Sequence, residues 1–347
     1  MTAPADIRIE CLEHWCVENV PDCRTPLRVT LIAGGHSNLT YRIDGANGRS
    51  LALRRPPLGE LPRSAHDVLR EYRILAALKA TAFPVPRVEA ACADTAVLGA
   101  PFYVMSWVDG TILDRASALE AILPAVEQRQ QVAFNLIDVL ADLHTLDIDA
   151  VGLGQLGARQ DYLSRQLHRL RRVWDTTKTR ELPLIESLYE RLLAAQPVQR
   201  YTGLVHADYR MGNVILAAGG RIAAVLDWEL CALGDVLTDL GFLLVNWDEP
   251  GDFWPNVWME VPPTRAGGFP SRDDMISRYA KRTGFDVADI DYYRAFCYWR
   301  IAVIAEGIKR RYEAGAMSTQ MTDAAALDKR VRDRAALAEH FLTLAHG

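Results

Sequence analysis

The segment of residues 204–216 combines residue types that suit the transfer of a phosphoryl group. It contains the pattern H-x-D-x-x-x-x-N, formed by His206, Asp208 and Asn213, and Asp227 follows at the end of an apolar run. One carboxylate in a loop can align an acceptor hydroxyl and take its proton. An amide oxygen and a second carboxylate are hard ligands of the kind that Mg²⁺ prefers beside phosphate oxygens. The spacing therefore predicts Asp208 as the catalytic base and Asn213 and Asp227 as metal ligands.

Each of these residue types also has an ordinary structural use. An Asp or Asn in a turn commonly closes an Asx-turn or caps a helix. That explanation would have to hold for Asp208, Asn213 and Asp227 together, and the ordered set favours the chemical interpretation.

A second group of residues, nearer the N-terminus, suits the phosphates of a nucleotide. Gly34, Gly35, His36, Ser37 and Asn38 lie between two apolar runs, and small residues there let backbone N–H groups approach phosphate closely. The same residues could form a simple hairpin turn. This stretch carries neither the Rossmann fingerprint nor the Walker loop, so it predicts a different kind of phosphate loop.

The first part of the chain reads as a small sheet with one helix packed on it. A helix is expected at residues 5–20 and another at residues 64–79, with Ser64 as its cap. Strands are expected at residues 27–33, 39–44, 50–54, 87–93 and 102–107.

Beyond residue 110 the hydrophobic pattern becomes mainly helical, at residues 119–146, 161–175 and 184–195, with short strands at 203–206, 213–216 and 222–226. The whole pattern predicts an α+β protein of two lobes. Residues 1–107 would form an N-lobe that binds the nucleotide. Residues 108–347 would form a mainly helical C-lobe with the catalytic loop, the metal ligands and the acceptor site.

On these residues the chain resembles the aminoglycoside phosphotransferase family, which is related to choline kinase and more distantly to protein kinases. The resemblance rests on the H-x-D-x-x-x-x-N loop and on Asp227-Trp228, and it extends from about residue 27 to about residue 314. It implies a protein-kinase-like two-lobed fold. It also implies an enzyme that uses ATP and Mg²⁺ to phosphorylate a hydroxyl group of a small molecule.

The resemblance implies further roles around the nucleotide. Arg54 stands where such kinases commonly carry a lysine, and Glu71 is its expected partner. A guanidinium stays charged and can hold phosphate oxygens, although a surface arginine is the alternative. Backbone groups of Ser106 and Val108 would bind the adenine.

Other residues are expected to organise the catalytic loop rather than to react. His206 would support it by packing and hydrogen bonding, and Arg210 is grouped with His206 as a supporting residue. Asp235 and Asp239 would organise the following loop and helix, and Asp235 also suits a helix cap.

The acceptor pocket is expected in the C-lobe, where residues 246–300 contain nine Asp/Glu and seven Lys/Arg. An aminoglycoside is a polycation and would need a cluster of carboxylates, so this balance disfavours it. Residues 298–311 resemble the branch of the family that also occurs fused to acyl-CoA dehydrogenases. That resemblance implies a hydroxyacid or hydroxyacyl-CoA acceptor, with Arg300 or Lys309 meeting its carboxylate or phosphate. A solvated helix end is the alternative for Lys309 and its neighbours.

Two competing functions stay open, an aminoglycoside 3′-type phosphotransferase and a nucleotide-binding pseudokinase or regulatory module. The intact set of Asp208, Asn213 and Asp227 disfavours the pseudokinase. An acceptor screen would separate the two kinase hypotheses.

Composition narrows the class of protein. The net charge of -5 disfavours nucleic acid as a partner, and no apolar run approaches the length of a membrane span. The N-terminus lacks the pattern of a signal peptide. The six cysteines form no C-x-x-C pair, which predicts reduced, mostly buried thiols in a cytoplasmic protein.

Overall fold

The computed structural model describes residues 4, 6–33, 38–58, 67–252, 261–314 and 324–345 of the chain. The chain divides into two compact units. The first unit comprises Met1–Gly110, Asp149–Leu153 and Ala223–Leu230, and the second comprises the rest. The segment that carries Asp227 therefore groups with the N-terminal part of the chain.

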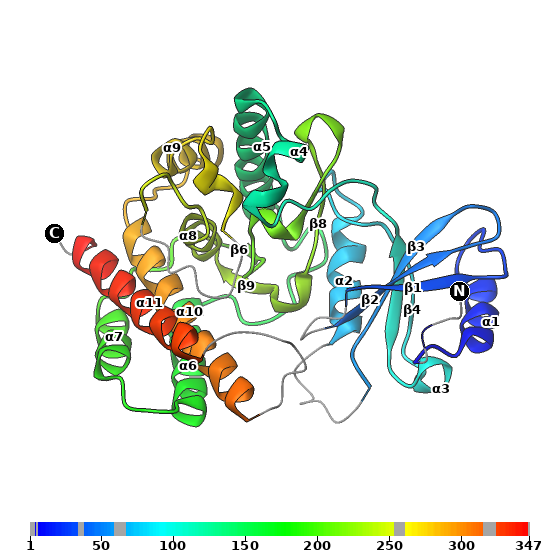
Figure 1. Ribbon diagram of the computed structural model, residues 1–347, viewed down its shortest axis with the longest axis horizontal. Coiled ribbons are helices and arrows are strands. Elements are labelled where there is room, and N and C mark those ends of the chain that lie inside the picture. The colour runs from blue at the N-terminus through cyan, green and yellow to red at the C-terminus, as the bar shows by residue number, and fades with distance from the viewer. Residues whose placement is uncertain are drawn as a thin grey trace. The chain divides into compact units, whose positions relative to one another are not determined.

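The first unit contains a five-stranded antiparallel sheet in the order β1-β2-β3-β5-β4 (Figure 1). Its strands are β1 (Arg28–Ala33), β2 (Leu39–Asp44), β3 (Ser50–Arg55), β4 (Val88–Cys92) and β5 (Phe102–Ser106). These bounds confirm the five predicted strands. The strands β2 and β3 pair from Asp44↔Ser50 to Leu39↔Arg55, so the Gly- and Asn-containing residues 45–49 join them as a hairpin.

The two faces of this sheet have different partners because side chains alternate along a strand. Leu51 and Leu53 of β3 join a core cluster with Leu12 of α1 (Ile9–Asn19). Arg54 points to the other face, where α2 (Val68–Leu78) packs against β4 and β5. Arg55 returns to the first face and pairs with Asp6. Two adjacent arginines thus have opposite surroundings, and only Arg54 reaches the α2 face.

The start of α2 corrects the predicted helix cap. Ser64 lies outside the described residues, and the helix begins at Val68 rather than beside Ser64. Asp67 is the N-cap, with a side chain that accepts a hydrogen bond of 2.9 Å from the Arg70 N–H. A short helix, α3 (Thr95–Leu98), occupies the stretch before β5 and was not predicted.

The second unit is mainly helical. Its helices are α4 (Leu119–Ile122), α5 (Val126–His144), α6 (Tyr162–Thr177), α7 (Pro183–Ala194), α8 (Leu237–Val245), α9 (Arg272–Thr283), α10 (Ile290–Glu313) and α11 (Ala324–Leu344). The helices α10 and α11 lie side by side, and α10 also packs on α8 (Figure 1). Every residue of α8 is buried, so this helix forms the centre of the unit.

The helix predicted at residues 119–146 is broken into α4 and α5. Pro124 lies between them, and a proline in a helix interior removes a hydrogen bond and clashes with the preceding turn. The break ends α4 after one turn, and the long periodic stretch becomes α5 alone.

A two-stranded antiparallel sheet leads into the catalytic loop. It pairs β6 (Thr202–Val205) with β9 (Ala232–Asp235), from Thr202↔Asp235 to Val205↔Ala232. The strands β7 (Val214–Leu216) and β8 (Ile222–Val225) follow the loop, close to the predicted bounds. β9 was not predicted, and its Gly234 is tightly packed, because a Cβ there would lie 2.1 Å from the Tyr162 ring.

All six cysteines are free, and all except Cys11 are buried, as predicted. Among the residues that the structure describes, no helix has both the length and the apolar character needed to cross a membrane.

Candidate active site

The catalytic loop begins where β6 ends and closes in a 3-10 turn, Met211–Asn213. The Asn213 side-chain nitrogen donates to the Asp208 carbonyl at 2.8 Å and to Asp208 Oδ2 at 2.6 Å. Because the amide nitrogen of Asn213 has these partners, its Oδ1 is the atom left to act as an acceptor or a metal ligand. The structure thus places two of the predicted site residues in direct contact.

Asp208 has partners on both its backbone and its side chain. Its N–H donates to His206 Nδ1 at 3.2 Å, and Arg210 Nε lies 3.7 Å from Asp208 Oδ1. Burial raises the pKa of Asp208, while Arg210, His206 and Arg300 lower it. Its side chain is 23% exposed, so the carboxylate remains within reach of a ligand.

The loop backbone before Asp208 is held by Asp239, at the start of α8. Asp239 Oδ2 accepts from the His206 N–H at 2.6 Å, and Oδ1 accepts from the Ala207 N–H at 2.7 Å. His144 Nε2 lies 3.3 Å from Asp239 and orients the carboxylate, while His144 Nδ1 lies 2.7 Å from the Tyr279 hydroxyl. Asp239 therefore organises the loop, as the family resemblance implied.

Asp235, the last residue of β9, organises the start of α8. It accepts from the Tyr293 hydroxyl at 2.7 Å and from the Leu237 N–H at 3.3 Å, although Val236 occupies the cap position of α8. Burial raises the pKa of Asp235 to about 6, and the two hydrogen bonds oppose this rise.

In the first unit, Arg54 joins two carboxylates. Arg54 Nε lies 2.9 Å from Glu71 Oε2, and Arg54 Nη2 lies 2.6 Å from Asp227 Oδ1. Glu71 is 2% exposed and also accepts from Asn38 Nδ2 at 2.7 Å and from the Tyr103 hydroxyl at 3.0 Å.

Charge compensation keeps Arg54 ionised. Burial alone would lower the pKa of Arg54, but Glu71, Asp227 and Glu229 raise it. Burial raises the pKa of Glu71, and the guanidinium of Arg54 opposes that rise. The predicted pair of Arg54 and Glu71 is thus in contact. Glu229, 3.7 Å from Arg54, was missed by the sequence reasoning, although it follows Asp227 by only two residues.

Asp227 sits in an unusual backbone conformation, with φ of 66°. The neighbouring Trp228 fixes this turn by donating from Nε1 to the Val225 carbonyl at 3.0 Å and packing edge-on against Phe83. A non-glycine residue in the left-handed region is commonly held there for function. The Asp227 side chain is 32% exposed, and its hard oxygens suit Mg²⁺.

The remaining predicted nucleotide residues have mixed outcomes. Gly34, Gly35, His36 and Ser37 lie outside the described residues. The Asn38 side chain is buried against Glu71, so it supports the Arg54 pair. The Ser106 N–H donates to the Arg87 carbonyl at 2.7 Å, so within Ser106 the carbonyl is the backbone group suited to adenine. Val108 follows in the segment after β5.

The second unit contains a cavity of about 220 Å³ near the end of α8. Trp247 and Phe269 form part of its wall, with ring centroids 5.6 Å apart, and Asp248 and Glu249 add carboxylates. The Trp247 indole donates to the Pro270 carbonyl at 3.0 Å, which fixes the ring.

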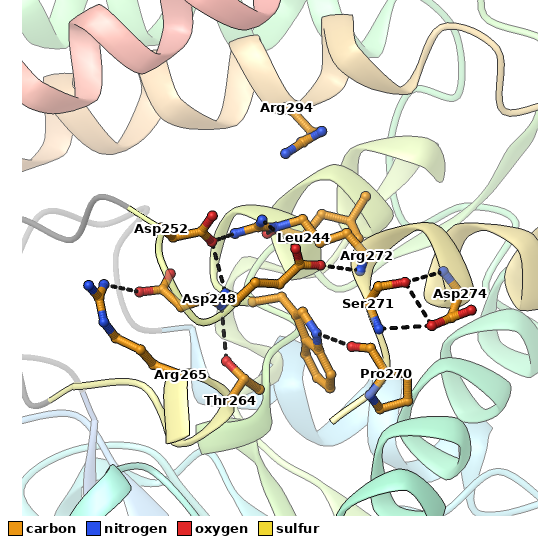
Figure 2. A network of polar contacts seen from close by, with 12 residues as sticks. Leu244, Asp248, Asp252, Thr264, Arg265, Pro270, Ser271, Arg272, Asp274 and Arg294 are labelled. Carbon is orange, nitrogen blue, oxygen red and sulfur yellow. Dashed lines mark hydrogen bonds and ion pairs between the residues drawn. The ribbon is translucent and has the colours of Figure 1, made fainter. Parts of the chain in front are cut away.

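Arginines neutralise much of the negative charge around this cavity (Figure 2). Arg272 pairs with Asp252 and lies 3.6 Å from Glu249, and Arg265 lies 3.5 Å from Asp248. Burial raises the pKa of Asp248, and the nearby arginines Arg334, Arg272 and Arg265 oppose this rise.

Two cations proposed to meet the acceptor have internal partners instead. Arg300 is 6% exposed and donates from Nη2 to the Ala207 carbonyl at 2.6 Å. Lys309 is 7% exposed and donates to Thr179 Oγ1 at 2.9 Å. The prediction that they bind a carboxylate or phosphate of the acceptor is wrong, because α10 turns both side chains into the interior.

Known proteins match this chain both in sequence and in overall fold. The phosphotransferase enzyme family model matches residues 28–269. Acyl-CoA dehydrogenase family member 10 of Mus musculus is 32% identical over 298 residues, which is 85% of this chain and 27% of that protein. The chain therefore spans about a quarter of the length of this curated relative. The match agrees with the predicted resemblance to the branch fused to acyl-CoA dehydrogenases.

Solved structures confirm the predicted α+β, protein-kinase-like fold. A protein from Ralstonia eutropha, provisionally described as an aminoglycoside phosphotransferase, is 30% identical, with a TM-score of 0.80 over 96% of this chain and 98% of that chain. An amicoumacin kinase in complex with AMP-PNP and Ca²⁺ shares the fold at 15% identity, with a TM-score of 0.61 over 97% of this chain and 95% of that chain. The extent of the family match and the 30% identity to a whole solved chain show that this chain belongs to the phosphotransferase enzyme family.

Proposed function

We propose that the chain is a small-molecule kinase that moves the γ-phosphate of ATP to a hydroxyl group. The observation that carries the proposal is the catalytic loop, in which Asn213 fixes the Asp208 carboxylate and Asp239 holds the two preceding N–H groups. Membership of the phosphotransferase family supports it. In this proposal residues 1–107 form the nucleotide lobe and residues 108–347 form the catalytic and acceptor lobe.

Asp208 acts as the base in this proposal. Its carboxylate accepts the proton of the acceptor hydroxyl while the hydroxyl oxygen bonds to the γ-phosphorus and the bond to ADP breaks. The raising of its pKa by burial suits this role, because a carboxylate with a higher pKa is a stronger base. His206 and Arg210 support the loop.

The donor chemistry of two residues, one from each unit, is of the kind that Mg²⁺ prefers. Asn213 Oδ1 and the Asp227 carboxylate are oxygen donors of the type that this ion prefers, and we propose them as its ligands. When bound, Mg²⁺ supplies positive charge that neutralises the phosphates.

Arg54 is proposed to hold phosphate oxygens on the nucleotide side. Glu71 keeps the guanidinium in place, and the backbone of Ser106 and Val108 receives the adenine. Residues 34–38 complete the proposed site as a phosphate loop. The amicoumacin kinase in complex with AMP-PNP supports nucleotide binding at the level of the fold.

We propose a hydroxyacid or a hydroxyacyl-CoA thioester as the acceptor, with the cavity beside Trp247 contributing to its recognition. The carboxylates near this cavity are paired with Arg265 and Arg272, so a polycation gains little Coulomb energy there. The aromatic wall instead suits an apolar chain. The name of the Mus musculus relative, an acyl-CoA dehydrogenase, is consistent with acyl chemistry.

The free cysteines favour a cytoplasmic location for the protein.

The test is a measurement of ADP release from ATP and Mg²⁺ across hydroxyacids, hydroxyacyl-CoA thioesters, aminoglycosides and choline-like alcohols. We expect kcat/KM to be highest for the hydroxyacyl class, and Asp208→Ala to remove acceptor-dependent release. An aminoglycoside preferred by more than tenfold, or about 1.4 kcal/mol of discrimination, would favour a resistance enzyme. Nucleotide binding without transfer to any of these acceptors would favour a pseudokinase.

A further inference from the structure

Arg300 is a buried cation whose position the proposed chemistry does not yet explain. It lies on α10, is 6% exposed, and donates from Nη2 to the Ala207 carbonyl at 2.6 Å. Its guanidinium carbon also lies 5.0 Å from the centre of the Phe242 ring. Removing a guanidinium from water is costly unless it gains hydrogen bonds or charge partners. The principal hydrogen bond of Arg300 is made to the residue directly before Asp208.

The contact fixes the peptide group that joins Ala207 to Asp208. Arg300 holds the carbonyl of this peptide, while its N–H, which belongs to Asp208, donates to His206 Nδ1 at 3.2 Å. The two preceding N–H groups, of His206 and Ala207, are bound by Asp239. Three successive peptide groups thus have bound N–H groups, and Arg300 binds the carbonyl of the third.

Ala207 needs such support because its backbone is strained. Its φ is 69°, in the left-handed region that residues with a Cβ rarely adopt. Such a conformation persists only when the surrounding structure imposes it. If the Ala207 carbonyl lost its partner, this peptide could rotate, and the Asp208 side chain would change direction with it.

We propose that Arg300 is a positioning residue for phosphoryl transfer, which holds the Ala207–Asp208 peptide so that the Asp208 carboxylate faces the acceptor hydroxyl. This inference rests on the proposed kinase function. It also gives a role to the motif of residues 298–311, which the sequence analysis had linked to the acceptor. A residue that only filled the core would contribute to the stability of the protein and not to turnover by the folded enzyme.

Lys309 provides a matched control. It is a buried cation on the same helix, 7% exposed, and it bonds Thr179 rather than the catalytic loop. The variants to compare are Arg300→Met, Arg300→Lys and Lys309→Met, each first shown by circular dichroism to be folded.

Steady-state kinetics of ADP release, with the best acceptor of the screen, give the first measurement. A displacement of about 1 Å in a catalytic group costs on the order of 10²-fold in rate, so we expect Arg300→Met to lower kcat by about 10- to 100-fold. The KM for ATP should stay within about twofold, because Arg300 does not touch the nucleotide residues. Arg300→Lys should recover part of kcat, since an ammonium can still donate to a carbonyl. Lys309→Met should keep the wild-type kcat.

Hydrogen exchange of the backbone amides gives a second measurement that needs no activity. Arg300→Met should speed exchange at His206, Ala207 and Asp208 relative to Lys309→Met. If Arg300→Met does not fold, Arg300→Lys carries both measurements, with smaller changes in the same direction.

The inference is overturned if Arg300→Met and Lys309→Met have equal kcat values, or if exchange in the loop is unchanged by the Arg300 variants. Absence of transfer by the wild-type protein would instead contradict the proposed function. In that case faster loop exchange would still support the positioning role of Arg300, and unchanged exchange would refute it.

Discussion

Replacing Arg54 removes the cation that holds two carboxylates of the first unit. The guanidinium lies 2.9 Å from Glu71 through Nε and 2.6 Å from Asp227 through Nη2, and its side chain is 14% exposed. Arg54→Ala would leave Glu71, which is 2% exposed, without its cation. Arg54→Lys would keep the positive charge but lose the forked geometry of the guanidinium. A single ammonium group could not bind both carboxylates in the way that Arg54 does.

The expected loss of unfolding free energy depends on the hydrogen bonds that Glu71 retains after Arg54 is removed. Breaking a buried ion pair by removing one partner costs about 3–5 kcal/mol. Glu71 retains hydrogen bonds from Asn38 and Tyr103, and it can take up a proton, so we expect about 3 kcal/mol for Arg54→Ala. For Arg54→Lys we expect about 1.5 kcal/mol, the lower end of the range for one hydrogen bond to a charged group.

This cost should depend on pH in a definite direction. Burial raises the pKa of Glu71 from 4.5 to about 7, and loss of Arg54 would raise it further. Between the pKa of Glu71 in the unfolded chain and its higher pKa in the folded variant, Glu71 is protonated only in the folded state. The stability of the variant therefore falls as pH rises through this interval. Arg54→Ala should therefore be more destabilising at pH 8 than at pH 6.

Urea unfolding followed by tryptophan fluorescence, at both pH values, measures these free energies. Arg42→Ala is the matched control, because Arg42 lies on β2, next to the strand of Arg54, pairs with Asp44 of the same strand and is 38% exposed. It should cost less than about 1 kcal/mol, as exposed ion pairs do. Calorimetry with ATP and Mg²⁺ should show weaker binding for Arg54→Ala than for Arg54→Lys. If both Arg54 variants stay within about 0.5 kcal/mol of the wild type, the typical range of surface substitutions, the ion pairs of Arg54 do not contribute to stability as argued.

Three further predictions concern the carboxylates. Asp208→Ala should lower turnover by about 10²–10⁴-fold, with ATP affinity retained in calorimetry, and near-wild-type turnover would contradict its role as base. Asp227→Ala should weaken ATP binding in the presence of Mg²⁺ much more than in its absence, and an unchanged metal dependence would exclude Asp227 as a ligand. Asp235 has a pKa raised by burial from 3.8 to about 6, so it should reduce stability by up to about 3 kcal/mol as pH rises from 4 to 7. Asp235→Asn should remove that slope in thermal unfolding, and an unaltered slope would show that another group causes it.

The catalytic loop could be predicted from the sequence because its contacts are local. Asp208 and Asn213 are five residues apart, and one short loop brings them together. The pair of Arg54 and Glu71 was predicted by analogy with kinases, and strand alternation explains why Arg54 rather than Arg55 reaches α2. Asn38 and Tyr103 could not be assigned to Glu71 in this way, since their contacts depend on the register of the sheet.

The elements that were missed have weak local signals. The strand β9 contains Gly234 and Asp235, which are residue types typical of turns, and it exists because β6 pairs with it. Ser64 was predicted to cap α2 because serine is a favourable N-cap residue. Aspartate is equally favourable, and Asp67 is the residue that caps the helix. Propensity does not decide between two good caps three residues apart.

The buried positions of Arg300 and Lys309 on α10 could not be predicted from the sequence. This helix is buried over much of its circumference, including Arg300, Glu306 and Lys309, so no polar face marks a side turned to solvent. A charged residue in such a helix suggests a ligand when its neighbours are unknown. The structure shows that Arg300 donates a hydrogen bond to the backbone of the catalytic loop and that Lys309 donates one to Thr179.

The two arginines near the proposed chemistry should therefore act on different kinetic constants. Arg54 contacts carboxylates and is 14% exposed, so its guanidinium can exchange a carboxylate for a phosphate when a nucleotide binds. Arg300 contacts a carbonyl and is 6% exposed, so its partner should stay the same throughout the reaction. Changes at Arg54 should thus appear mainly in ATP affinity and KM, and changes at Arg300 mainly in kcat.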